Sequence, residues 1–213
     1  MNKKVLAVFG GSFNPPLNSH FSLAEQIVQE YSNIEKVIFV PVSQKYPKEG
    51  LIEDLHRYNM LKLVCDKNDK FIVSDIELKF ERQLFTIETL EFIERDYPDY
   101  LIYFTIGTDN LKELSTWKLA EKLVSKFKIF VIERAEDNFD EIINNDIFLS
   151  NNKDAFIKLK ENIRSNISSS FVREKLKNGK SIRYFTPDEV YYYIIENNLY
   201  KGNWNNVGKK CFN

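Results

Sequence analysis

Five short, mostly apolar runs recur along the chain, with amphipathic segments between them. The runs occupy residues 4–9, 36–40, 70–74, 101–106 and 128–132. Each is nearly continuous rather than alternating, which is typical of parallel strands covered on both faces. Residues 22–31, 55–65 and 86–97 instead carry apolar side chains at helical spacing. Alternating strands and helices predict a doubly wound α/β fold with a mainly parallel sheet.

The C-terminal part of the sequence predicts helices rather than further strands. Residues 168–176 follow a run of good N-cap residues and end near Asn178-Gly179, which is a suitable C-cap. Thr186-Pro187 and two acidic residues predict an N-cap, an N1 proline and an acidic first turn for a helix over 190–197. We therefore expect one Rossmann-like domain over residues 1–213, with a C-terminal helical part at about 167–200. Residues 137–166 show no clear pattern.

Composition narrows the class of protein. The 213 residues include 30 Lys and Arg and 31 Asp and Glu, dispersed along the chain, and this balance argues against a nucleic-acid partner. No stretch approaches the ~20 apolar residues of a membrane span, and the apolar run at residues 5–9 is too short for a signal sequence. Cys65 and Cys211 alone cannot build a structural zinc site or a disulfide framework. These features predict a cytoplasmic protein.

The clearest chemical signal is the turn after the first predicted strand. It reads Gly10-Gly11-Ser12-Phe13-Asn14-Pro15-Pro16-Leu17-Asn18-Ser19-His20 and leads into a helix. Backbone N–H groups and a helix N-terminus at this end of a strand favour an anion site, although a ligand-free tight turn is the simpler alternative. His20 could donate a hydrogen bond or carry positive charge there. Neither a Gly-x-Gly-x-x-Gly motif nor a complete Walker A loop is present.

This turn resembles the signature loop of the nucleotidyltransferase superfamily with a His/Thr-x-Gly-His box. Further blocks, in the same order and spacing, resemble the bacterial nicotinate-nucleotide adenylyltransferase family. They are Arg57-Tyr58-Asn59-Met60-Leu61, residues 84–90, Gly107-Thr108-Asp109 with Trp117, Glu133-Arg134, residues 167–173 and residues 190–200. The resemblance covers nearly the whole chain except about 137–166.

The resemblance implies transfer of the adenylyl group of ATP to nicotinate mononucleotide, with release of pyrophosphate, in NAD biosynthesis. Such a reaction depends on positioning and on stabilising charge on the phosphates. Mg²⁺ is expected to arrive with ATP and to be held largely by substrate phosphates, so no metal-ligating residue is assigned. The implied partners are ATP and a mononucleotide, with no nucleic acid and no membrane, and a homo-oligomer stays open.

The resemblance also implies roles for individual residues. His20 and Arg173 are the catalytic candidates, both directed at ATP phosphates. The other candidates for ATP binding are Gly10, Gly11, Ser12, Phe13, Gly107, Asp109, Ile167, Ser168 and Ser169. The candidates for binding the nicotinate nucleotide are Asn14, Lys48, Thr86, Trp117 and Arg134. Each also has a structural reading: a solvated arginine or lysine, a plain N-cap for the serines and Asp109, or a core position for the tryptophan.

One position departs from the family in a way that matters. Leu17 stands first in the box, where the family carries a His or Thr that bonds phosphate. Leucine donates nothing, so we expect one phosphate contact to be missing unless Asn18, Lys45 or Lys48 replaces it. Three hypotheses remain: an active adenylyltransferase with a substituted contact, a related nucleotidyltransferase with another phosphorylated acceptor, and a nucleotide-binding module with impaired catalysis. The sequence does not decide between the acid and the amide mononucleotide.

Overall fold

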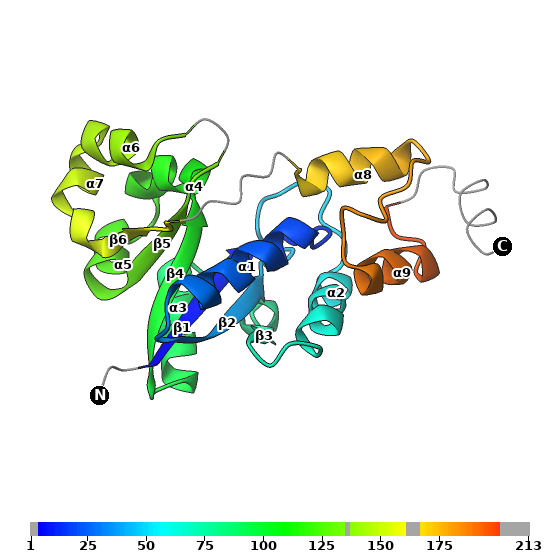
Figure 1. The fold of residues 1–213 in the computed structure, drawn as a ribbon, viewed down its shortest axis with the longest axis horizontal. Helices are drawn as coiled ribbons and strands as arrows, with labels where there is room; N and C mark the ends of the chain where they lie inside the picture. Colours follow the sequence, from blue (N-terminus) through cyan, green and yellow to red (C-terminus); the bar gives the residue numbers. More distant parts are fainter. Residues whose placement is uncertain (1–3, 135–136, 161–166, 201–213) are drawn as a thin grey trace.

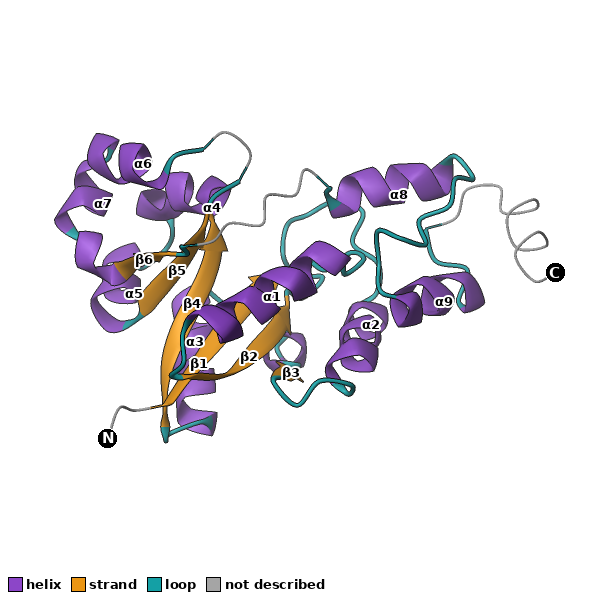
Figure 2. Ribbon diagram, in the orientation of Figure 1, coloured by secondary structure: helices purple, strands orange, loops and turns teal. Residues whose placement is uncertain are grey.

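A parallel sheet forms the centre of the molecule (Figure 1, Figure 2). The computed structural model describes residues 4–134, 137–160 and 167–200. Its strands are β1 (Lys4–Gly11), β2 (Ile34–Pro41), β3 (Phe71–Val73), β4 (Tyr100–Gly107), β5 (Lys128–Ile132) and β6 (Phe156–Lys158). They lie in the order β3-β2-β1-β4-β5-β6, and every neighbouring pair is parallel. The predicted Rossmann-like α/β fold is confirmed.

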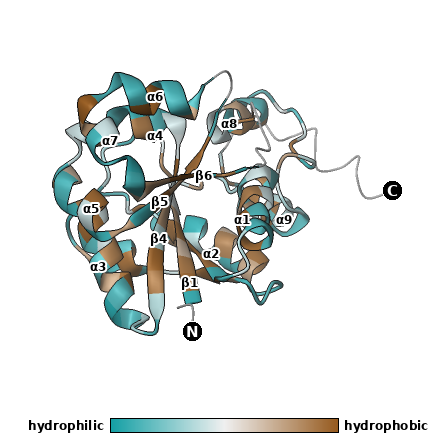
Figure 3. Ribbon diagram, turned by 60° about the vertical axis from the view of Figure 1, so that its left-hand side comes forward, coloured by the Kyte–Doolittle hydropathy of each residue, from teal (hydrophilic) through white to brown (hydrophobic). Residues whose placement is uncertain are grey.

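Helices cover both faces of this sheet. They are α1 (Asn18–Glu30), α2 (Asp54–Cys65), α3 (Thr86–Asp96), α4 (Thr108–Glu113), α5 (Ala120–Lys126), α6 (Phe139–Asn145), α7 (Ile147–Asn151), α8 (Ser169–Lys177) and α9 (Asp188–Glu196). Successive strand residues point to opposite faces: Val5 and Ala7 join one buried cluster with α1, and Leu6 and Val8 join another with α3. Both faces are therefore apolar, and hydrophobic residues gather in the strands and on the inner sides of the helices (Figure 3).

A third apolar cluster holds the C-terminal helices against α2, at one end of the molecule (Figure 1). Val172 and Leu176 of α8 and Val190 of α9 are completely buried in it, together with Met60 of α2. Gly179 has a φ of 66° just after α8, so the predicted C-cap is confirmed. The predicted cap of the last helix is shifted by one residue.

The shift concerns Thr186 and Pro187. Pro187, not Thr186, is the N-cap residue of α9, and the buried Thr186 hydroxyl has no hydrogen-bond partner among the described residues. Asp188 and Glu189 do form the acidic first turn, as predicted. The threonine side chain was expected to bond the helix N-terminus, but it makes no such bond and is buried.

Residues 137–160, unassigned from the sequence, contain α6, α7, a 3₁₀ turn (Lys153–Ala155) and β6. Asn138 caps α6 by accepting bonds from two backbone N–H groups, and Asp146 caps α7 from the Leu149 N–H. The strand β6 has three residues and depends on its ladder with β5, a long-range contact that a sequence pattern does not show. Residues 161–166 of this unassigned stretch lie outside the described residues.

None of the helices described within these ranges is long and apolar enough to cross a bilayer.

Candidate active site

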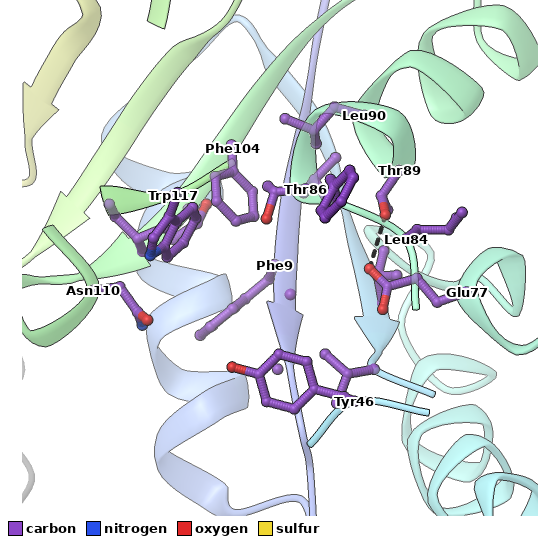
Figure 4. A pocket seen from close by; sticks show the side chains of 18 of the residues that line it. Phe9, Tyr46, Glu77, Leu84, Thr86, Thr89, Leu90, Phe104, Asn110 and Trp117 are labelled. Carbon is purple, nitrogen blue, oxygen red and sulfur yellow. Dashed lines mark hydrogen bonds between the residues drawn. The ribbon is translucent and has the colours of Figure 1, made fainter. Parts of the chain in front are cut away.

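A cavity of about 450 Å³ opens where the carboxyl ends of β1 and β4 lie side by side (Figure 4). From β1 the chain adds strands on one side as far as β3 and then continues on the other side with β4, so the strand order reverses between β1 and β4. Open α/β sheets bind ligands at such a point. The volume is typical of a small-molecule site. The predicted site residues that line the cavity are Gly10, Gly11, Ser12, Lys48, Thr86, Gly107, Trp117 and Arg134.

The turn after β1 follows a sharply bent path beneath aromatic rings. Phe13 has a φ of 43°, a conformation that costs a non-glycine residue free energy and needs support from its surroundings. Its ring packs edge-on against Phe9 and His20, with centroids 6.0 and 5.2 Å apart. A Cβ atom on Gly11 would lie 3.1 Å from the Phe13 ring. The glycine and the ring together therefore set the course of the backbone along the cavity.

A buried arginine supports this turn from behind. Arg57 of α2 is fully buried, and its Nη1 donates to the Ser12 carbonyl at 2.9 Å. Its Nε donates to the Ile52 carbonyl at 3.2 Å, and its other nitrogen pairs with Asp54. The sequence showed Arg57 only as part of a matching block, because nothing in its neighbours indicates that it is buried. It is a positioning residue for the glycine-rich turn.

The start of α8 holds the same turn from another side. Arg173 donates its Nη1 to the Asn14 carbonyl at 2.8 Å, and Ser169 donates its hydroxyl to the Pro15 carbonyl at 2.8 Å. Ser168 is the N-cap and accepts a bond from a backbone N–H of the first turn. Arg173 thus points toward the glycine-rich turn, which the expected phosphate role requires. That role itself remains a prediction.

His20 is a neutral hydrogen-bonding group in this structure. Its Nδ1 accepts a bond from the Leu17 backbone N–H at 2.9 Å, so the ring proton belongs on Nε2. Burial, together with the charge of Arg134, lowers the pKa of His20 to about 4. Of the two roles left open by the sequence, this arrangement favours a neutral hydrogen-bond donor.

Leu17 does not face the cavity. It is 1% exposed and packs in the third apolar cluster with Met60, Val172 and Leu176. The Leu17 side chain thus joins the turn to the C-terminal helices instead of facing the cavity. The expected loss of one phosphate contact stays a prediction. Its backbone N–H still contributes to the site, through His20.

The end of β4 builds the opposite rim. Asp109 and Arg134 form an ion pair with Oδ1 and Nε 3.3 Å apart, and both side chains are about half exposed. Gly107 lies beneath them, and a Cβ there would overlap atoms of both. Thr108, fully buried, accepts the Arg134 backbone N–H at 3.0 Å and so ties the end of β5 to α4. Asp109 lies beside the cavity lining, with its carboxylate engaged by this arginine.

Thr86 and Trp117 both line the cavity, and Phe104 lies between them in Figure 4. Thr86 is the first residue of α3, so the positive end of that helix faces the cavity. Trp117 packs against Phe104, with ring centroids 6.4 Å apart, and its half-buried ring also lines the cavity. Phe104 was seen in the sequence only as a strand residue, yet it forms part of this wall.

Two residues predicted to bind the nicotinate nucleotide have different surroundings. Lys48 donates to the Ser12 hydroxyl at 3.3 Å, and partial burial, with Arg173 and Arg134 nearby, lowers its pKa. Asn14 is 1% exposed, and its side chain bonds the Gly50 carbonyl and the Tyr200 hydroxyl. Lys48 is placed to meet an anion, whereas Asn14 is part of the scaffold.

Ile167 is 38% exposed and directly precedes the N-cap of α8, outside the cavity lining.

Glu77 is a cavity residue that the sequence analysis missed. It lies on the short 3₁₀ helix η1 (Ile76–Lys79), and its carboxylate accepts the Thr89 hydroxyl at 2.8 Å (Figure 4). Burial raises its pKa to about 7. The available signal was weak: a single acidic residue between Ile76 and Leu78 after the third strand.

The described ranges contain no group of three or more His, Cys, Asp or Glu side chains placed to hold a metal ion.

Comparison with protein families matches residues 8–175 to the cytidylyltransferase-like family. A "probable nicotinate-nucleotide adenylyltransferase" of Carboxydothermus hydrogenoformans is 34% identical over 197 residues, covering 92% of this chain and 98% of that protein. A relative with the same description from Lachnoclostridium phytofermentans is 35% identical over the same shares of the two chains.

A solved structure from Plasmodium falciparum has a similar fold. It is a nicotinic acid mononucleotide adenylyltransferase complexed with NaAD, with a TM-score of 0.76 and 24% identity over 94% of this chain and 99% of that one. At this identity the likeness supports the fold alone.

The position of Leu17 leads to a stability prediction. Leu17→His places an imidazole in an apolar cluster and should lower the free energy of unfolding by about 2–4 kcal/mol without raising turnover. Leu17→Met is the matched control and should cost less than about 1.5 kcal/mol. Denaturant unfolding and a turnover assay measure the two effects. A faster enzyme with unchanged stability would show that residue 17 faces substrate.

The lowered pKa of His20 predicts a pH-dependent stability. The folded protein resists protonation of this ring, so stability is fully present above the unfolded pKa of about 6.5 and is lost as pH falls toward 4. Between pH 7 and 4 the wild type should lose about 3 kcal/mol more than His20→Gln. Parallel unfolding curves for the two proteins over this range would contradict the assigned environment.

Proposed function

The chain belongs to the cytidylyltransferase-like family, and on that premise we propose that it is a nicotinate-nucleotide adenylyltransferase. It joins nicotinate mononucleotide to the adenylyl group of ATP and releases pyrophosphate. The observation that carries the proposal is the meeting of α8 with the glycine-rich turn, where Arg173 bonds the Asn14 carbonyl beside the cavity. The names and coverage of the curated relatives support the choice of substrates.

The reaction asks for positioning rather than covalent chemistry by the protein. A phosphate oxygen of the mononucleotide attacks the α-phosphorus of ATP, a new P–O bond forms, and the bond to pyrophosphate breaks. Negative charge accumulates on the leaving phosphates. His20 donates its Nε2–H toward them, and Arg173 and Lys48 supply positive charge from opposite sides of the turn. Fixed donors and charges of this kind are effective because they need no reorganisation during the reaction.

The two substrates use different walls of the cavity. The adenosine part lies near the end of β4, where the Asp109 carboxylate accepts bonds from the ribose hydroxyls. The nicotinate ring stacks on Trp117, and its carboxylate meets the N-terminus of α3 at the Thr86 backbone N–H. Arg134 lies between these two parts of the cavity, and its positive charge attracts a phosphate group of the substrates. This arrangement supports an acidic acceptor because a helix N-terminus favours negative charge.

Mg²⁺ would be held mainly by the ATP phosphates and would neutralise part of their charge.

A substrate panel tests the proposal. Purified protein should release pyrophosphate from ATP with nicotinate mononucleotide and form the acid dinucleotide, which chromatography identifies. The amide mononucleotide and CTP should each give much lower kcat/KM. Faster turnover with CTP or with another phosphorylated acceptor would favour a different transferase, and calorimetric ATP binding without any product would indicate a binding module.

A second prediction concerns the arginine of α8. Arg173→Lys removes the planar fork but keeps the charge, and Arg173→Ala removes both. The alanine variant should lose about 10²–10³-fold in kcat/KM, and the lysine variant should recover part of that loss. Lys175→Ala on the same helix is the control, since Lys175 lies over the Phe171 ring. Equal rates for Arg173→Ala and Lys175→Ala would remove Arg173 from the site.

A further inference from the structure

A hydrogen-bonded joint on the cavity wall connects three elements that are distant in sequence. Glu77 of η1 accepts the hydroxyl of Thr89, which is on the second turn of α3. The backbone of Ser43, in the loop after β2, also lies close to this carboxylate and lowers its pKa. Thr89 is three residues beyond Thr86, so the joint sits one helical turn from the start of α3.

From Ser43 the bonds continue to the glycine-rich turn. The Ser43 hydroxyl donates to the Asp54 carboxylate at 3.3 Å. Asp54 pairs with Arg57, and Arg57 donates to the Ser12 carbonyl at 2.9 Å. Thr89 and Ser12 both line the cavity, on its two sides, and the intermediate groups are partly or fully buried. Buried bonds of this kind are stronger than exposed ones and hold their members in one arrangement.

We propose that Glu77 is a positioning residue that sets the spacing between the start of α3 and the glycine-rich turn, and hence between acceptor and ATP. The inference rests on the proposed function, because it assigns the acceptor to α3 and ATP to the turn. Reaction between two bound substrates requires the attacking oxygen within about 3–3.5 Å of phosphorus, so a small change in this spacing matters. Glu77 acts in this role through its contact with Thr89 and not on the reacting atoms.

This joint requires the ionised form of the Glu77 carboxyl group. The Thr89 hydroxyl donates to the Glu77 carboxylate, and the Ser43 backbone faces it as a second donor, which an ionised carboxylate can accommodate. A protonated carboxyl would itself need an acceptor. The positive charge of Arg57 favours the ionised form, whereas burial opposes it, so Glu77 titrates near pH 7.

Other charged groups around Glu77 are arranged on the same elements. Asp54 on α2 faces Ser43 and is paired with Arg57. Tyr46 and Lys48 line the cavity from the loop after β2. On α3, Glu88 is turned to Arg82, with oxygen–nitrogen distances of 2.6 and 2.8 Å, away from the joint.

Glu77→Gln is the first test because it keeps the shape of the side chain. Its amide oxygen can still accept from Thr89, but its NH₂ group cannot accept the second bond. We expect kcat/KM for nicotinate mononucleotide to fall by about 10- to 10²-fold. The calorimetric Kd for ATP should be unchanged, because α8 still holds the turn. Glu81→Gln, at an exposed position just beyond η1, is the control and should behave as wild type.

A matched pair at Thr89 separates this role from simple folding. Thr89→Ser keeps the hydroxyl, and Thr89→Val keeps the shape without it. The serine variant should retain near wild-type kcat/KM, whereas the valine variant should lose about tenfold or more, the range for a hydrogen bond to a charged group. Thermal unfolding of all variants shows whether the loss follows stability instead.

The last test is the pH dependence of kcat/KM. The ratio of wild-type to Glu77→Gln kcat/KM, which cancels titration of the substrate, should rise with pH through about 7. The proposal is overturned if this ratio is flat, or if Glu77→Gln matches Glu81→Gln in kcat/KM. A wild type that makes no dinucleotide overturns the proposed function, a result distinct from an active wild type with active Glu77 variants.

Discussion

Side-chain hydrogen bonds to the carbonyl groups of one turn hold the active-site geometry together. The peptide units that follow Asn14 and Pro15 end in proline nitrogens, so they carry a carbonyl acceptor but no N–H donor. Buried carbonyls need partners, and Arg173 and Ser169 of α8 provide them. The prolines thus make the turn dependent on a helix that lies about 150 residues away. Arg57, from a third element, completes the support at Ser12.

The same contacts concentrate charge in a protein that has almost none overall. The net charge is −1, yet three basic side chains, Arg173, Arg134 and Lys48, lie near one another. Burial and the charges of the two arginines together lower the pKa of Lys48. Folding therefore creates a local positive potential from dispersed residues, where anionic substrates are expected. His20 stays neutral within this field because its Nδ1 is bonded to the backbone and its ring is buried. A neutral donor beside fixed cations adds a hydrogen bond without adding repulsion.

Leu17 shows how packing and chemistry share a single turn. Its side chain belongs to the cluster of α2, α8 and α9, while its backbone N–H orients His20. The apolar contact fixes the start of α1 against α8, the helix that carries Arg173. An apolar residue at this position of the box is therefore compatible with an intact turn, since its side chain attaches the turn to α2, α8 and α9.

Local signals determined much of this protein. Continuous apolar strands and amphipathic helices indicated the parallel sheet because burial on both faces leaves a pattern in neighbouring residues. The glycine-rich turn after β1 placed the site for a similar reason, since a strand end, a turn and a helix start are adjacent in sequence. Tertiary structure alone decided which way side chains face: Asn14 into the scaffold, Leu17 into the core, and Glu77 onto the cavity wall. It also decided the pairing of β6, because these outcomes depend on contacts between residues far apart in the chain, which no short segment encodes.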